Sequence, residues 1–331
     1  MKSTFAILVL GLLLAPFGHA QNPTASPAAT AAPAAGREPF VTLTVAPWLT
    51  TAYGQWEVQG VTQDGVVRSR LEWDRLDSAL LLIKGRVQLA PAIALGGSYA
   101  SGNVSDGRNT DSDSLQPPLS LNDYLFSRSE SATDGDTQLY DVNFYLDLLR
   151  LSRATTRAGQ RFELFVGYQD YRDRLTDRRG VQTFLNDRTV NQPFPDQGVN
   201  ARYEFHWQAA RLGVQLQTPI APRVAISGSA ALLALVQQNG DGAWTMRDDL
   251  RQNGPNLRNE SRDGVGFDVD GAFSFALTPA LDLTAGARWI ALADNSGHLT
   301  VYYADGGSAQ MEQTSISSSR IGVYAGLTAK F

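Results

Sequence analysis

The last eleven residues of the sequence alternate between apolar side chains and polar or small ones. One face would carry Ile321, Val323, Ala325, Leu327, Ala329 and Phe331, and the other Gly322, Tyr324, Gly326, Thr328 and Lys330. A period of two is typical of a β-strand, and about ten such residues can cross a bilayer as a tilted strand. The strands of soluble β-sandwiches also alternate between apolar and polar side chains, so a membrane strand is predicted only if the rest of the chain repeats the pattern.

The N-terminal residues predict export. Lys2 precedes an apolar run over residues 5–14, and small residues follow at Gly18-His19-Ala20, which is the pattern of a secretory signal peptide. Residues 21–38 are rich in Ala, Pro, Thr and Ser and predict a disordered periplasmic leader. We therefore expect a signal peptide over 1–20, a leader over 21–38 and one folded domain over 39–331.

Composition narrows the class further. The chain has no Cys, which suits an oxidising compartment in a fold that needs no disulfide. Its net charge of −5 argues against nucleic acid as a partner. After the signal peptide there is no run of 18 apolar residues, so any membrane crossing has to be made by strands.

Ten strands are predicted, joined alternately by short Pro-containing turns and by long polar loops. They cover residues 40–58, 67–89, 92–108, 137–153, 161–178, 200–217, 223–240, 257–277 and 281–294, and a tenth ends at Phe331. The long loops cover 109–136, 179–199, 241–256 and 295–314. Alternating short and long connections are typical of a transmembrane barrel with periplasmic turns and extracellular loops. The fold class predicted is all-β, a ten-stranded antiparallel transmembrane β-barrel in the outer membrane with both termini periplasmic.

Two details of this barrel follow from the pattern. The apolar parity of residues 200–217 changes between Trp207 and Leu212, which predicts a β-bulge there. Ten strands enclose a narrow interior, and its predicted charged residues are Lys84, Arg86, Asp141, Asp147, Asp268, Asp270, Asp282 and Arg288. Their mutual pairing favours a plugged lumen over an open diffusion pore.

Several segments resemble the omptins, a family of ten-stranded outer-membrane endopeptidases of Gram-negative bacteria. The similar segments are Ser69-Arg70-Leu71-Glu72-Trp73, Asp136-Thr137-Gln138-Leu139-Tyr140 and Gly167-Tyr168-Gln169-Asp170-Tyr171-Arg172. The similarity extends in order from about residue 40 to the end of the chain.

This resemblance implies a catalytic site without a metal or cofactor. An acidic pair in the family's second outer loop falls on Asp111 and Asp113, and an Asp–His pair in its fourth loop falls on Asp241 and Ala243. Two close carboxylates can hold and polarise a water, but Ala243 cannot replace the histidine base. Two alternatives remain for the catalytic site. One consists of Asp111, Asp113 and Asp241 alone and would favour low pH, and the other is completed by His298.

The resemblance also implies a lipopolysaccharide site on the outer wall, with lipopolysaccharide as an activating lipid. The family's positions fall on Tyr168, Asp170, Arg172, His206 and Arg262. The first three continue the parity of Phe162, Leu164 and Val166, so they face away from the lumen, where an arginine can bind a phosphate.

Three functions are compatible with these features. The first is an omptin-type, aspartic-like endopeptidase whose acidic rim attracts basic peptides. The second is a non-proteolytic surface barrel that acts in binding or adhesion, with host surface proteins as partners. The third, a small porin, is disfavoured by the narrow charged lumen.

Overall fold

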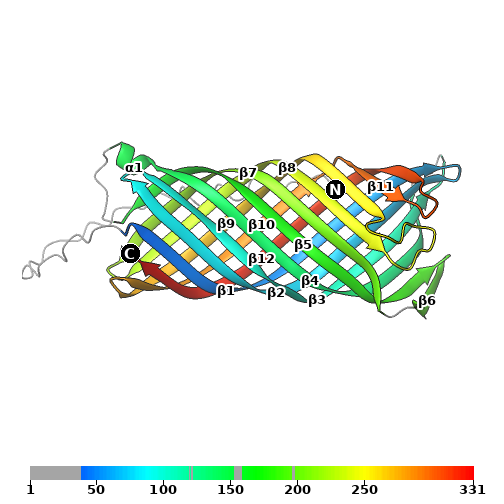
Figure 1. Cartoon of the computed structure of the whole chain (residues 1–331), viewed down its shortest axis with the longest axis horizontal. Helices are drawn as coiled ribbons and strands as arrows, with labels where there is room; N and C mark the ends of the chain where they lie inside the picture. Colours follow the sequence, from blue (N-terminus) through cyan, green and yellow to red (C-terminus); the bar gives the residue numbers. More distant parts are fainter. Residues whose placement is uncertain (1–38, 119, 121, 153–158, 196–197) are drawn as a thin grey trace, which may run out of the picture. The chain divides into compact units, whose positions relative to one another are not determined.

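Ten long antiparallel strands close into a barrel in the computed structural model (Figure 1). In ring order they are β1 (Val41–Thr62), β2 (Gly65–Ala90), β3 (Ile93–Gln116), β4 (Tyr124–Asp147), β5 (Arg161–Leu185), β7 (Val199–Ala221), β8 (Val224–Trp244), β9 (Leu257–Thr278), β10 (Leu281–Asp294) and β12 (Ser308–Lys330). The structure describes residues 39–331 except 119, 121, 153–158 and 196–197. The predicted signal peptide and leader lie outside these residues.

Pairing of β12 with β1 seals the barrel. Val45 lies opposite Leu327, and Thr51 opposite Ile321. At the end of the seam, the Phe40 amide donates to the Phe331 carbonyl at 2.7 Å, and the Phe331 amide donates to the Val41 carbonyl at 2.9 Å. Closure leaves these long strands without a free edge, which is what a strand-built membrane span requires. The predicted all-β, antiparallel barrel is confirmed.

Three short elements complete the described fold: α1 (Leu148–Leu151), β6 (Arg188–Pro193) and β11 (His298–Tyr302). β6 pairs with the far end of β5, and β11 lies between β9 and β12. None of the described helices is long and apolar enough to cross a membrane.

The strands are longer than predicted at the end of the barrel away from Phe40 and Phe331. The expected loop 109–136 is strand except over residues 117–123, and β6 and β11 form within the expected loops 179–199 and 295–314. Most residues on both faces of the β3 and β4 extensions are polar, and β6 and β11 have only six and five residues, so the backbone ladder continues where the long apolar alternation has ended. Sequence periodicity cannot detect a strand of that kind.

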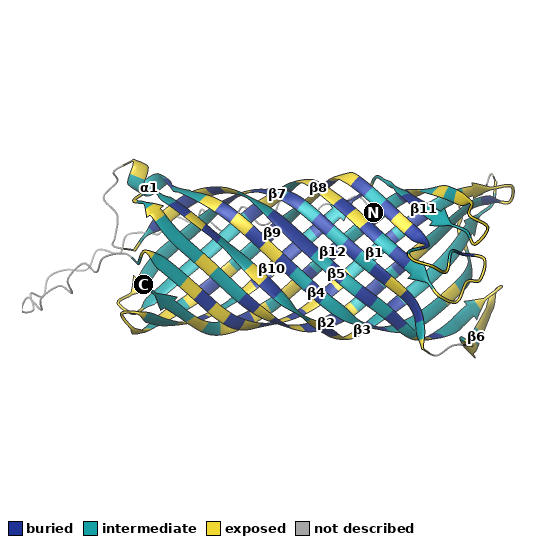
Figure 2. Cartoon of the chain, in the orientation of Figure 1, coloured by how far each residue is buried: buried dark blue, intermediate teal, exposed yellow. Residues whose placement is uncertain are grey.

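Burial alternates along each strand, as Figure 2 shows. The outer wall carries a band of exposed apolar residues that includes Leu43, Val45, Leu49, Leu81, Leu95, Val142, Phe144, Leu164, Val166, Leu212, Leu232, Phe273, Phe275, Leu283, Val323 and Leu327. This band is the part of the wall suited to lipid. Beyond it, on the side away from Phe40 and Phe331, the outer wall is charged, with Asp136, Arg174, Arg178 and Glu204 on β4, β5 and β7. The strands therefore extend past the membrane at that end.

The predicted bulge lies on a different strand. Side chains of β7 keep one parity, because Trp207 is buried inside and Leu212 is exposed outside. The register between β7 and β8 shifts at Gln208/Ala210, and the extra residue is in β8, where Leu235 has a φ of 52°. The sequence pattern suggested a change of parity because Trp207 is a large apolar residue that points into the lumen and not toward lipid.

Candidate functional site

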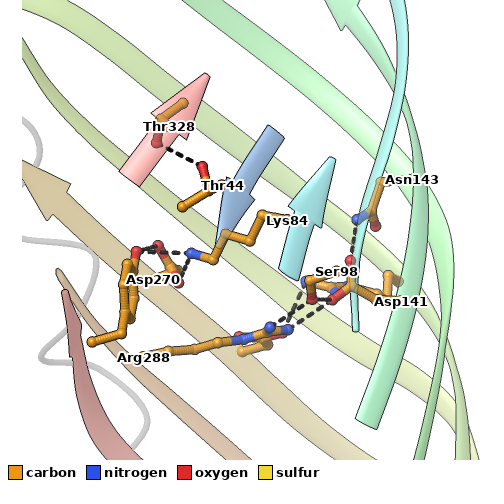
Figure 3. Close-up of polar contacts among 11 residues, drawn as sticks. Thr44, Lys84, Ser98, Asp141, Asn143, Asp270, Arg288 and Thr328 are labelled. Atoms are coloured by element: carbon orange, nitrogen blue, oxygen red, sulfur yellow. Dashed lines mark hydrogen bonds and ion pairs between the residues drawn. The ribbon is translucent and has the colours of Figure 1, made fainter. Parts of the chain in front are cut away.

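Charged side chains cross-link the lumen in the half of the barrel that holds Phe40 and Phe331. The Arg211 guanidinium of β7 contacts Asp141 at 3.0 Å and Asp268 at 2.9 Å. The Arg288 guanidinium of β10 contacts the same two carboxylates at 2.9 and 2.6 Å. Figure 3 shows Asp141 and Arg288 meeting inside the barrel, where Ser98 also hydrogen-bonds to Asp141. We call Asp141, Arg211, Asp268 and Arg288 the lumen quartet. Their contacts join strands on opposite sides of the lumen.

The other predicted lumen charges are paired as well. Lys84 Nζ lies 2.6 Å from Asp270 and 2.7 Å from the Tyr324 hydroxyl. Further contacts join Arg86 to Glu163, Lys330 to Asp282 and Arg150 to Asp147. The predicted pairing of the lumen charges is therefore confirmed. Sequence reasoning missed Arg211, because the parity of β7 was misread.

Aromatic and aliphatic side chains fill the lumen beyond this charged layer. The rings of Trp73 and Tyr203 lie 5.0 Å apart, edge to face, and Trp73 meets Phe205 in the same way. Buried around them are Trp48, Trp56, Leu76, Leu80, Leu82, Leu139, Leu175, Trp207 and Leu233. This packed layer separates the charged part of the lumen from the far mouth of the barrel.

Asp111 and Asp113 lie on the inward face of β3 at that mouth. A register shift between Val104 and Arg108 moves the inward positions from even to odd numbers, so Asn109, Asp111 and Asp113 share one face. Asn109 donates to the buried Asp177 of β5. Asp111 Oδ1 is shielded from solvent and has no hydrogen-bond partner among the described residues. The structure thus brings the predicted acidic pair together with Asp177, which sequence reasoning did not single out.

Burial raises the pKa values of these three carboxyl groups, which lie beyond the apolar band. Burial, followed by the charges of Asp113 and Asp177, raises the pKa of Asp111 to about 8. Burial raises the pKa of Asp177 to about 6, although hydrogen bonds from Thr133 and Asn109 oppose the shift. Burial also raises the pKa of Asp113, against hydrogen bonds from Ser69 and Ser127. At neutral pH, Asp111 therefore retains its proton.

Asp241 and Ala243 do not join this pair. The bulge at Leu235 moves the inward positions of β8 from odd to even numbers, so that Gln238 is buried and Asp241 faces outward. Asp241 instead accepts a hydrogen bond from Arg258 Nε at 3.0 Å on the outer wall. We expected Asp241 and position 243 to face the acidic pair across the lumen. Because of the one extra residue in β8, both face outward instead.

Neither described histidine supplies the missing base. His206 is on the outer face of β7, and His298 is next to the buried Leu299 on β11, so its side chain points away from the lumen. The inward positions of β8 at this height are Gly240 and Gly242, and Tyr203 and Leu257 fill the space beside Gly242. Among the described residues, no group of three or more His, Asp or Glu is placed to hold a metal ion.

The predicted outer-wall residues form a second cluster. The His206 Nε2 atom lies 2.7 Å from Asp170 Oδ2, and the Tyr168 hydroxyl donates to the same oxygen at 3.3 Å. Gln208 Nε2 donates to the Tyr168 hydroxyl at 2.7 Å. Arg172 lies beside them with its Nε 3.4 Å from Glu204. We call these residues, at the charged edge of the apolar band, the outer-wall cluster.

Arg262 is separate from the outer-wall cluster. It is exposed on β9, and β8 lies between β9 and β7. The structure therefore brings four of the five predicted lipopolysaccharide residues together and leaves Arg262 two strands away.

The fold and the outer apolar band define an outer-membrane β-barrel with a filled lumen. The chain belongs to the family described as Protochlamydia outer membrane protein (Pom), whose model matches residues 55–320. No curated protein matches the sequence.

One solved structure has the same architecture. The outer membrane protease OmpT from Escherichia coli superposes with a TM-score of 0.73 at 15% identity, over 88% of this chain and 96% of that one. At this identity, the likeness to OmpT is one of fold. A FadL homologue from Pseudomonas aeruginosa (TM-score 0.30, 9% identity, 90% and 94% of the two chains) and the toluene transporter TbuX from Ralstonia pickettii (0.29, 8%, 89% and 90%) also match. Their TM-scores are too low to inform the fold.

Proposed function

We propose that this protein is a non-proteolytic surface barrel of the outer membrane, which binds through its extracellular end. In this orientation the acidic mouth and the β6 and β11 extensions face outward, and the end of the barrel that holds Phe40 and Phe331 faces the periplasm. The acidic mouth would hold basic segments of a surface partner without cleaving them. The quartet and the aromatic layer would block diffusion through the lumen.

One observation supports the loss of proteolysis. The inward positions opposite the acidic pair on β8 are Gly240 and Gly242, whereas Asp241 is held outside by Arg258. Hydrolysis by an activated water needs a group that accepts its proton within hydrogen-bond reach. Asp111, the most buried member of the pair, carries a proton of its own at neutral pH.

A fluorogenic peptide with adjacent basic residues tests this proposal. Refolded protein with lipopolysaccharide should bind the peptide, raising its fluorescence anisotropy, and leave it uncleaved between about pH 4 and 8. OmpT serves as the positive control. Cleavage that disappears in Asp111→Ala would overturn the proposal.

Endopeptidase activity is the second candidate, and the acidic pair itself favours it. Asp111 and Asp113 face the mouth together, and raised pKa values let one carboxyl donate a proton while the other accepts one. Such a site would work best under acidic conditions. Cleavage confined to the acidic end of the same assay, and lost in Asp113→Asn, would establish it.

We also propose that the outer-wall cluster binds lipopolysaccharide. Tyr168 and His206 enclose Asp170, while the neighbouring Arg172 can turn from Glu204 to a lipid phosphate. We expect Arg172→Ala to weaken lipopolysaccharide binding about tenfold, the effect of one lost charge-assisted hydrogen bond. Arg70→Ala, an exposed arginine of β2, is the matched control. Equal binding by both variants would refute the site.

A further inference from the structure

The connection between β8 and β9, residues 245–256, lies at the far mouth of the barrel (Figure 1). Its first amide, that of Thr245, donates to a β7 carbonyl at 3.1 Å. Further along, the Arg251 amide donates to the carbonyl of Tyr302, the last residue of β11, at 3.0 Å. Leu250 between them is 1% exposed. We call this connection the mouth loop, and these contacts fix it between β7 and β11.

The mouth loop carries an exposed ion pair. Arg247 Nε donates to Asp249 Oδ1 at 2.7 Å, and Arg247 Nη2 donates to Asp249 Oδ2 at 2.6 Å. Both side chains are more than half exposed. An ion pair of this kind adds little to the stability of a fold, so the Arg247 guanidinium can exchange partners at small cost.

Arg247 acts on the acidic pair from across the opening. Asp113 is on β3, and the mouth loop leaves from β8, on the other side of the ring of strands. Burial raises the pKa of Asp113, and the charge of Arg247 opposes this shift. Hydrogen bonding to Asp249 raises the pKa of Arg247, and the charge of Asp113 adds to it. Charges interact over about 10 Å in salt solution, so the guanidinium extends over the mouth.

We propose, given that the mouth holds basic segments of a partner, that Arg247 takes the place of the partner's basic group until the partner displaces it. The guanidinium is then shared between two carboxylates, Asp113 at the mouth and Asp249 in the loop. A basic segment compensates Asp113 when Arg247 turns away, and a neutral segment does not. Arg247 is thereby a specificity-determining residue, which disfavours neutral partners.

Two single substitutions should change partner binding in opposite directions. Arg247→Gln removes the internal competitor and should tighten binding of a peptide with adjacent basic residues about fivefold. Asp249→Asn releases the guanidinium to turn toward Asp113 and should weaken binding by a similar factor. Arg247→Lys retains the charge and should bind like the unmodified protein. Fluorescence anisotropy of the labelled peptide, with full-length protein refolded in lipopolysaccharide, measures each affinity.

The chain offers a matched control pair on the outer wall. Arg258 and Asp241 form an ion pair of similar exposure at 3.0 Å, outside the mouth, so Arg258→Gln and Asp241→Asn should change the affinity less than twofold. The heat-dependent gel mobility of each variant confirms that its barrel has formed. In an Asp113→Asn background, Arg247→Gln should lose most of its effect, because the carboxylate that it exposes is gone.

The outcomes separate this inference from the proposed function. Equal binding by Arg247→Gln and the unmodified protein overturns the role of Arg247 and leaves the mouth as a binding site. A gain that persists undiminished in the Asp113→Asn background also overturns it, because the competition would then not be for Asp113. No binding by either the unmodified protein or Arg247→Gln overturns the proposed function, and this role with it.

Discussion

The Arg86 guanidinium holds the Glu163 carboxylate through two hydrogen bonds, of 2.8 and 2.5 Å, that join β2 to β5 inside the lumen. Glu163 is 1% exposed, so its charge has little solvation other than this contact. Removing one partner of a buried pair leaves an uncompensated charge and costs about 3–5 kcal/mol. We predict that Glu163→Gln lowers the free energy of unfolding in urea by this order, as followed by tryptophan fluorescence. The double variant Arg86→Met/Glu163→Leu should recover most of the loss, and equal stability of Glu163→Gln and the unmodified protein would contradict the prediction.

Acidic conditions should stabilise the mouth of the barrel. Folding raises the pKa of Asp111 from 3.8 to about 8, so between these values the folded protein keeps a proton that the unfolded chain has lost. Stability therefore falls as pH rises through this window, by at most about 1.4 kcal/mol per unit. Asp111→Asn cannot ionise and should flatten the dependence. Urea midpoints at about pH 5 and pH 8 provide the measurement, and identical slopes for the two proteins would exclude Asp111 as the source.

Restoring a histidine at position 243 should not restore hydrolysis. Ala243 lies opposite Arg202 on the outward face of β7 and β8, so a histidine there would lie on the outer wall. Position 242 faces inward, but a side chain there would begin 3.1 Å from Leu257. We expect Ala243→His to cleave no basic peptide in the fluorogenic assay. Activity in this variant would show that the Leu235 bulge is absent in the membrane.

Replacing His206 by arginine should strengthen lipopolysaccharide binding at the outer-wall cluster. An arginine is always charged, and its guanidinium can bind a phosphate through two parallel hydrogen bonds. We expect His206→Arg to bind lipopolysaccharide about tenfold more tightly, as measured by binding isotherms on immobilised lipopolysaccharide. Equal binding by this variant and the unmodified protein would show that no phosphate lies within reach of position 206.

The strand pattern and the lumen charges could be predicted from sequence, because lipid and an enclosed interior impose opposite polarity on alternate residues. Leu281–Asp294 has the predicted bounds, and Lys84 and Arg288 face inward as expected. Positions beyond the bulges could not be predicted. Asp111 and Asp241 both follow a register shift, and each shift depends on backbone geometry at a few residues, such as the positive φ of Leu235, that leaves no periodic signal.

The bulge at Leu235 decides which side chains of β8 face the mouth of the barrel. Because the bulge accommodates one extra residue, deletion of Leu235 would leave a regular strand with Gly240 and Gly242 still inward. A strand that kept Leu235 but lost the bulge would instead turn Asp241 and Ala243 toward the lumen. The backbone conformation of a single residue, and no side chain at the mouth, therefore keeps Asp241 apart from Asp111.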